Sequence, residues 1–336
     1  MATYKEAGVD ISAGEDTVRR IKPLVRSTFT EGVLTDIGAF GAFFAPPWRQ
    51  YDDPILVSSV DGVGTKLAVA VACDRHDTVG QDLVNHCVND IAVCGATPLF
   101  FMDYFAAGSL DPERTVSVIE GFATACRENG CALIGGEMAE MPGMYRVDDY
   151  DIAGTIVGMV DRSEIVDGST ISDGDVLIGL PSTGLHTNGF SLARHVLLSR
   201  FDVHDKPEEL GGESVGEVLL RVHRSYLGVI RRLLEQRLAV GFSHITGGGI
   251  AGNTRRILPD GLEIDVQWDA WERPAIFRLI QELGSVPESD MRSTFNLGIG
   301  LVAVVPVDRA AGAEALLRAA GEEPIIIGRI VREARE

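Results

Sequence analysis

Apolar side chains along this chain recur with two different periods, which predicts helices interleaved with strands. Over residues 77–94 the apolar positions fall three and four apart, which is typical of a helix that buries one face. Residues 55–61 are apolar and β-branched and lead into Gly62, which is typical of a strand entering a tight turn. The same patterns predict further helices over residues 15–26, 111–129, 190–198, 217–234 and 250–257, and strands over residues 99–105, 131–134, 151–160, 176–180 and 297–306.

Because helices and strands alternate throughout, we predict an α/β (α+β) fold with two domains, each a mixed β-sheet flanked by helices. The 336 residues are enough for two domains of ordinary size. A polar stretch at residues 167–175 gives the expected boundary, with domains at 1–170 and 171–336. Residues 32–47 are rich in glycine and aromatic residues and follow no period, which indicates a mobile loop or flap.

The chain is strongly acidic: 30 lysines and arginines stand against 49 aspartates and glutamates, so the net charge is −19. That balance argues against nucleic acid or an anionic membrane as a partner. The five cysteines show no C-x-x-C spacing, and Cys87, Cys94 and Cys126 fall on apolar helical positions, which indicates buried free thiols in a reducing compartment. The polar first 16 residues lack a signal core, and no apolar run is long enough to span a membrane, so we expect a soluble cytoplasmic protein.

The loop after residues 55–61 has the strongest chemical signal, because it brings Asp61, Gly62, Gly64, Thr65 and Lys66 together. The glycines let the backbone approach a ligand, while the carboxylate suits Mg²⁺ and the ammonium suits phosphate oxygens. The chain has no G-x-x-x-x-G-K-[ST] motif, so this is not a Walker loop. Taken alone, the segment also fits an ordinary D-G-x-G hairpin turn.

Further oxygen donors follow in the first half of the chain. Asn89 and Asp90 lie on the polar face of the helix predicted over residues 77–94, where they are either solvated or additional ligands of a hard cation. His86 shares that face, and we interpret it as an unpaired surface or packing residue. Glu137 follows two glycines at a strand end, which favours a metal ligand or a partner for a cationic amidine over an incidental loop charge.

Two segments of the second half are suited to phosphate. The loop at residues 182–189 leads directly into a helix, whose first N–H groups attract anions, and His186 can donate to phosphate or move a proton. A capping loop with an incidental histidine is the alternative. The turn formed by Thr246, Gly247, Gly248 and Gly249 precedes a helix too short for a Rossmann unit, so we interpret it as an anion-binding nest for a monophosphate.

In combination these segments resemble the phosphoribosylformylglycinamidine cyclo-ligase family, also called aminoimidazole ribonucleotide synthetases, of the PurM-like ATP-binding superfamily. The resemblance runs from residue 4 to about residue 330. It rests on the segments at residues 4–11, 60–67, 88–90, 135–145, 184–191, 244–249 and 294–296.

This resemblance implies that ATP phosphorylates the formyl oxygen of formylglycinamidine ribonucleotide, after which an amidine nitrogen closes the imidazole ring and phosphate leaves. It also implies Mg²⁺, often with K⁺, and a homodimer joined through the N-terminal sheets. The residues that map to the ATP–metal region are Lys22, Asp61, Lys66, Asp90 and Glu137, and those that map to the substrate side are His186, Asn188, Asn296 and the turn at residues 246–249. We therefore assign catalytic roles to Lys22, Lys66 and His186, metal ligation to Asp61 and Asp90, and ribonucleotide contacts to Glu137 and the substrate-side residues.

The rival interpretations from the same superfamily are selenophosphate synthetase, the hydrogenase maturation dehydratase, thiamin-monophosphate kinase and the large purine amidotransferase. A selenophosphate synthetase needs a cysteine in the glycine-rich loop, and residues 31–50 contain none. The hydrogenase maturation dehydratase uses a C-terminal cysteine, whereas this chain ends in Arg332-Glu333-Ala334-Arg335-Glu336, and the large purine amidotransferase is far longer. A nucleotide-sensing or metal-buffering protein is the non-catalytic alternative, and it predicts nucleotide binding without turnover.

Overall fold

The computed structural model describes residue 4 and residues 8–333, so residues 5–7 of the first matching segment and the last three residues of the chain lie outside the described part. Contacts divide the chain into two compact units. The first comprises the residues up to Ile91 together with Thr97–Arg162, and the second comprises Ala92–Ala96 together with the residues from Ser163 on.

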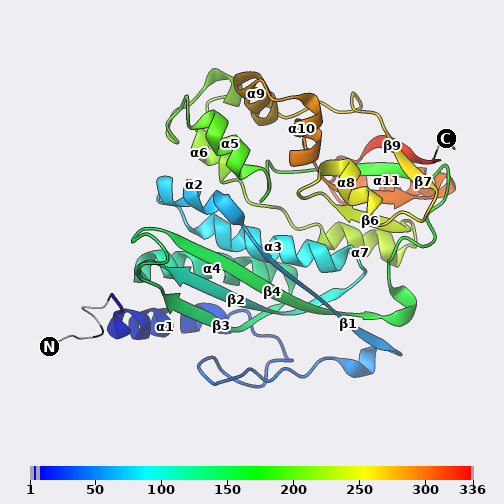
Figure 1. Ribbon diagram of the computed structural model, residues 1–336. Coiled ribbons are helices and arrows are strands. Elements are labelled where there is room, and N and C mark those ends of the chain that lie inside the picture. Colours follow the sequence, from blue (N-terminus) through cyan, green and yellow to red (C-terminus); the bar gives the residue numbers. More distant parts are fainter. Residues whose placement is uncertain (1–3, 5–7, 334–336) are drawn as a thin grey trace. The chain divides into compact units, whose positions relative to one another are not determined.

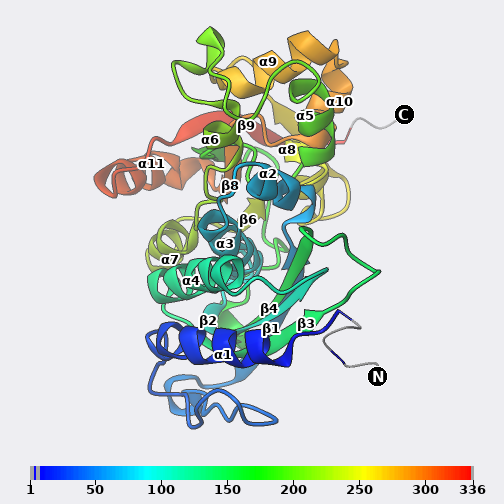
Figure 2. The same ribbon diagram turned by 90° about the vertical axis from the view of Figure 1, so that its left-hand side faces the viewer.

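The first unit is built on a four-stranded sheet in the order β1-β4-β2-β3, in which the neighbours β2 and β3 pair parallel and the other two neighbouring pairs are antiparallel (Figure 1). Helices α1, α3 and α4 line one face of this sheet, as Figure 2 shows. The elements are β1 (Pro54–Gly62), β2 (Thr97–Ala107), β3 (Ala132–Glu140) and β4 (Tyr150–Asp161), with α1 (Ile11–Arg26), α2 (Leu67–Ala72), α3 (Asp77–Ala92) and α4 (Pro112–Asn129).

Two glycines set the distance between α3 and α4. A Cβ atom on Gly80 would lie 2.2 Å from the carbonyl oxygen of Val118, and one on Gly121 would lie 2.2 Å from that of Asp77. The helices therefore cross backbone to backbone, which a side chain at either position would prevent. The predicted caps of α4 are present as well: Asp111 caps the N-terminus and Gly130 closes the helix with a φ of 68°.

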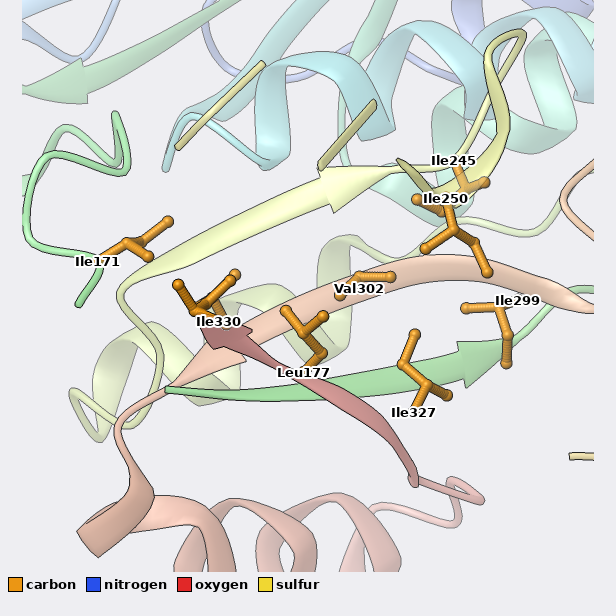
Figure 3. Packing of buried hydrophobic residues seen from close by; sticks show 9 residues of the cluster. Ile171, Leu177, Ile245, Ile250, Ile299, Val302, Ile327 and Ile330 are labelled. Carbon is orange, nitrogen blue, oxygen red and sulfur yellow. The ribbon is translucent and has the colours of Figure 1, made fainter. Parts of the chain in front are cut away.

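The second unit holds a five-stranded antiparallel sheet in the order β6-β8-β5-β9-β7. Its core consists of branched aliphatic side chains from the strands, from α8 and from the segment before β5, which contributes Ile171. Figure 3 shows Ile171, Leu177, Val302 and Ile330 among them. The elements are β5 (Val176–Pro181), β6 (Gly241–His244), β7 (Leu262–Val266), β8 (Ile299–Val305) and β9 (Ile325–Arg332), with α5 (Phe190–Leu197), α6 (Val215–Leu219), α7 (Leu227–Glu235), α8 (Gly249–Arg255), α9 (Ala275–Gly284), α10 (Glu288–Thr294) and α11 (Ala310–Ala319).

One predicted helix is wrong: residues 217–234 form α6 and α7 with a non-helical segment between them. The side chains of that segment turn to partners elsewhere in the unit. Arg224 pairs with Glu322 at 2.8 Å, and the Tyr226 hydroxyl donates to the carbonyl of Pro181 at 2.8 Å. These tertiary contacts outweigh the local helical pattern.

The cysteine prediction holds in part. All five cysteines are free, and Cys87, Cys126 and Cys131 are buried, whereas Cys73 and Cys94 are partly exposed. Within the described part of the chain, the helices are all too short or too polar to cross a membrane.

Candidate active site

The C-terminal end of β1 presents Asp61 on the side of the sheet that faces α3. The carboxylate lies 2.9 Å from Nε2 of His86. His86 is therefore paired, contrary to our interpretation, and it is buried, as the packing alternative requires and the surface alternative does not. Burial opposes both charges, yet the hydrogen bond outweighs it, so the pKa of Asp61 is lowered and that of His86 is raised. The sequence predicts that His86 lies on the polar face of α3, but it does not predict that Asp61 of β1 contacts this face.

Asp90 lies one turn further along α3 and accepts a hydrogen bond from Ser59 Oγ at 3.0 Å. Asp61 and Ser59 are two residues apart on β1, so both face the helix. The charge of Asp90 opposes part of the lowering of the Asp61 pKa. Two carboxylates close enough to repel each other form a donor set that fits a hard divalent cation. Asn89, beside Asp90, is fully buried.

Lys66 is not exposed to solvent as a phosphate-binding lysine would be, because it is buried and paired. Its side chain is fully buried, and Nζ lies 2.7 Å from Oδ2 of Asp82, which is buried as well. Burial lowers the pKa of the Lys66 ammonium, and the negative charge of Asp82 opposes that shift. A contact between Lys66 and a phosphate therefore requires that the lysine leave Asp82.

A cavity of about 640 Å³ lies beside α1, between residues 36–42 and the strands β2 and β3. Lys22 stands near its rim, with Nζ 2.9 Å from Asp36, and Arg26 pairs with the same carboxylate. These bonds, that of Arg26 above all, hold the pKa of Asp36 below its usual range. The lining is mostly apolar and includes Val18, Ile21, Val25, Ile37, Phe40, Met102, Phe105, Ile119, Leu133, Ile134 and Met138, with Asp36, Asp103 and Glu137 as its acids.

Asp103 is the residue of this cavity that the sequence analysis missed. It interrupts the apolar strand β2, and its carboxylate lies against Gly136, where a Cβ atom would be 2.3 Å from Oδ1. Burial raises the pKa of Asp103 to about 7. No basic side chain among residues 8–333 forms an ion pair with it, so the acid is available to a ligand in the cavity. The sequence signal that could have identified Asp103 is that it is the one acidic residue within an otherwise mostly apolar strand.

In the second unit, the loop before α5 holds His186 in the left-handed region, with a φ of 61°. The histidine is buried, and its Nε2 accepts the backbone N–H of Thr183 at 3.2 Å, so in the neutral ring the proton lies on Nδ1. Asn296 is also buried. Its amide donates to the carbonyl of Gly184 at 2.9 Å and accepts from Ser182 Oγ at 3.0 Å, which braces the loop.

The glycine turn before α8 is already partly hydrogen-bonded. The N–H of Gly248 donates to the carbonyl of Ser293 at 2.9 Å, and that of Gly249 donates to the carbonyl of Thr246 at 3.1 Å. Asn253, a buried residue that the sequence analysis missed, donates from Nδ2 to the carbonyls of Thr246, Gly247 and Gly249 at 3.3, 3.2 and 2.9 Å. The turn is thus a rigid element.

The two loops of the second unit meet. A Cβ atom on Gly247 would lie 3.4 Å from Oδ1 of Asn188, so the turn at residues 246–249 lies directly beside the loop at residues 182–189. The first unit therefore offers carboxylates and a cavity, and the second offers two adjoining, internally braced loops with neutral donors.

Comparisons with known proteins give the family of this chain. Residues 48–160 match the family model of the AIR synthase related protein N-terminal domain, and residues 172–336 match that of the C-terminal domain. The solved structure of thiamine-monophosphate kinase from Stenotrophomonas maltophilia superposes with a TM-score of 0.68 at 18% identity, covering 93% of each chain. The hydrogenase maturation protein HypE in complex with ATP superposes with a TM-score of 0.64, covering 97% of this chain and 88% of the other.

The fold and both domain matches define the chain as an α/β protein of the AIR synthase related class. Proteins named phosphoribosylformylglycinamidine cyclo-ligase are 52% identical in Anaeromyxobacter dehalogenans and 49% identical in Desulfitobacterium hafniense, each over 98% of this chain and at least 95% of the relative. The chain belongs to that ligase family. The predicted resemblance and the predicted α/β fold class, with sheets flanked by helices, are both confirmed. The first sheet is mixed as predicted, whereas the second is antiparallel throughout.

Proposed function

We propose that this chain uses ATP to close formylglycinamidine ribonucleotide into 5-aminoimidazole ribonucleotide. The γ-phosphoryl group passes to the formyl oxygen, and the amidine nitrogen attacks the carbon of the resulting iminophosphate. ADP leaves in the phosphoryl transfer, and the C–O bond then breaks as the ring closes, which releases phosphate. The observation that carries the proposal is the 52% identity over 98% of the chain to ligases of that name.

The test is ADP release by the purified protein with ATP, Mg²⁺ and formylglycinamidine ribonucleotide. We expect release that depends on the ribonucleotide and forms one aminoimidazole product per ADP. Release that depends on another phosphate acceptor and not on this ribonucleotide would contradict the proposal, and nucleotide binding with no turnover would favour a sensing role.

The metal site of the proposed reaction uses Asp61 and Asp90. Their oxygens fit Mg²⁺, which neutralises charge on the transferred phosphoryl group when it is bound. Asp61 must exchange its bond to His86 for the cation. We place the phosphates near Gly62, Gly64, Thr65, Lys66 and Asn89, with K⁺ as a second cation.

We assign the cavity of the first unit to the nucleoside of ATP. Its apolar lining suits a purine ring, and the Asp103 carboxylate can accept a hydrogen bond from the 6-amino group of adenine. Lys22 at the rim, once released from Asp36, is proposed to contact the phosphates. Free cysteines and a need for ATP support a cytoplasmic location.

Replacing Asp103 by Asn should raise the KM for ATP about tenfold, since an acceptor charge worth roughly 1.5–3 kcal/mol is lost. The kcat/KM ratio of ATP over GTP should fall, because the 6-oxo group of guanine accepts where adenine donates. The melting temperature should not fall, because a buried charge is removed. An unchanged nucleotide preference in the folded variant would exclude Asp103 from base recognition.

We also propose that residues 32–47 close over ATP. The structure gives this segment more order than its sequence predicts, because Leu34 N–H donates to Phe43 at 2.9 Å and Ala45 N–H donates to Gly32 at 2.8 Å. Its tip nevertheless leaves Phe40 fully exposed while residues 36–42 line the cavity. Closure would exclude water from the labile iminophosphate.

Hydrogen exchange should therefore slow at residues 36–43 when an ATP analogue and the ribonucleotide are both added, and the helix α4 in the same unit should change little. Equal exchange at residues 36–43 with and without ligands would argue against closure.

A homodimer formed through the first sheet completes the proposal. The side of β1 and β2 turned away from α3 exposes Leu56, Val60, Met102 and Tyr104 by 54%, 68%, 39% and 37%. Such an apolar strip on an open sheet face is typical of an interface. Sedimentation as a single chain at micromolar concentration would contradict this assignment.

A further inference from the structure

Three buried histidines from three segments of the second unit form one cluster. The His223 ring stacks on that of His186, with centroids 4.0 Å apart and planes 16° from parallel. On its other side, Nε2 of His223 lies 2.9 Å from Nε2 of His244. The exposed fractions of His186, His223 and His244 are 1%, 0% and 6%.

A single proton lies between Nε2 of His223 and Nε2 of His244. Two ring nitrogens at 2.9 Å cannot both carry hydrogen, so one imidazole donates and the other accepts. The tautomer of His223 then decides what its Nδ1 offers to Thr187 Oγ1, which lies 3.4 Å away. If Nδ1 carries the proton, it donates to Thr187, and the threonine hydroxyl is directed to another acceptor.

His223 stands between the two proposed phosphate-binding loops. His186 and Thr187 belong to the loop before α5, and His244 ends β6, two residues before the glycine turn. His186 is a non-glycine residue with a φ of 61°, and its ring is confined between His223 and Gly300, where a Cβ atom would lie 2.6 Å from Cε1 of His186. The break between α6 and α7 is what brings His223 to this place.

We propose that His223 is a positioning residue of the ribonucleotide-phosphate site, which ties the two loops together and orients the Thr187 hydroxyl. The inference rests on the proposed function, because it takes the phosphate of the ribonucleotide as the ligand of these loops. His223 itself touches no substrate. A phosphate near Asn188 favours the tautomer that frees the Thr187 proton, so binding of the anion and the state of the histidine pair are coupled.

The first test is His223→Phe, which keeps an aromatic ring against His186 and removes both nitrogen contacts. We expect the KM for formylglycinamidine ribonucleotide to rise at least tenfold and kcat to fall less than that. The KM for ATP should stay within twofold. His223→Gln keeps an amide that can reach His244 and should recover part of the lost affinity.

The matched control is His76→Phe in the first unit. His76 is also buried, and the variant loses the hydrogen bond between Nδ1 and Tyr150 Oη at 2.9 Å and the contact of Nε2 with Asp74 at 3.4 Å, but it lies outside the second unit. A comparable loss of melting temperature without a change in the ribonucleotide KM is expected. If His223→Phe and His223→Gln fold and leave that KM within twofold of wild type, His223 is only a core residue and the inference is overturned.

A second readout is the ¹⁵N spectrum of histidine side chains in the wild-type protein, with inorganic phosphate and then the ribonucleotide as probes. We expect the Nδ1 and Nε2 signals of His223 to change on titration, and signals that stay unchanged at saturation would overturn the inference. If the wild-type protein fails to turn over the ribonucleotide, the proposed function fails by itself. The phosphate titration then still decides whether His223 serves an anion site.

Discussion

The Asp90→Asn variant should turn over at least about a hundredfold more slowly than wild type and melt at nearly the same temperature. Metal-assisted charge stabilisation contributes several kcal/mol, and an amide is a poor substitute for a carboxylate ligand of Mg²⁺. The replacement has the same shape and can still accept the hydrogen bond of Ser59 Oγ. Steady-state rates across a range of Mg²⁺ concentrations provide the measurement.

The matched variant is Ser59→Ala, which removes the neighbouring hydrogen bond and leaves the carboxylate. Its loss of rate should be several-fold at most, and added Mg²⁺ should compensate. Wild-type activity of Asp90→Asn under limiting Mg²⁺ would remove Asp90 from the metal site.

Gly248→Asp should raise the KM for the ribonucleotide steeply, on the order of a hundredfold, while the KM for ATP moves much less. The new carboxylate would stand in the turn proposed to bind a phosphate, within a chain whose net charge is already −19. Kinetics with each substrate varied in turn separate the two effects. A collapse of ATP affinity with intact ribonucleotide affinity would reverse the assignment of the two sites.

Backbone strain is the competing explanation for that variant, because Gly248 has a φ of 102°. Gly248→Asn is the control, since asparagine has the shape of aspartate and no charge, and the backbone strain is similar. A Cβ atom at this position meets its nearest neighbour at 3.7 Å, so space is not the limit. The difference between the two variants is the contribution of charge.

Local patterns predicted the fold well, because helix and strand periods are set by which face of each element is buried. The strand into Asp61, the capped helix α4 and the buried β8 all follow this rule. The break after α6 does not, since its cause lies in partners such as Pro181 and Glu322 that are far away in sequence.

The candidate site was predicted at the level of residues but not of their partners. Asp61 and Lys66 were recognised by type, whereas their partners His86 and Asp82 on α3 were not identified. Asp103 and the bracing role of Asn253 depend on sheet register and on a turn that folds back, neither of which has a periodic signal.

The contact between Gly80 and Gly121 limits how this protein can diversify. One added methyl group at Gly80 would meet a backbone atom at 2.2 Å, so it would displace all of α3 and with it both Asp82 and Asp90. A substitution at Gly80 would therefore impair the metal site through Asp90, although Gly80 does not contact that side chain. Variant libraries aimed at the metal site must therefore keep Gly80 and Gly121. A substitution at either glycine would lower activity although no reacting group has been altered.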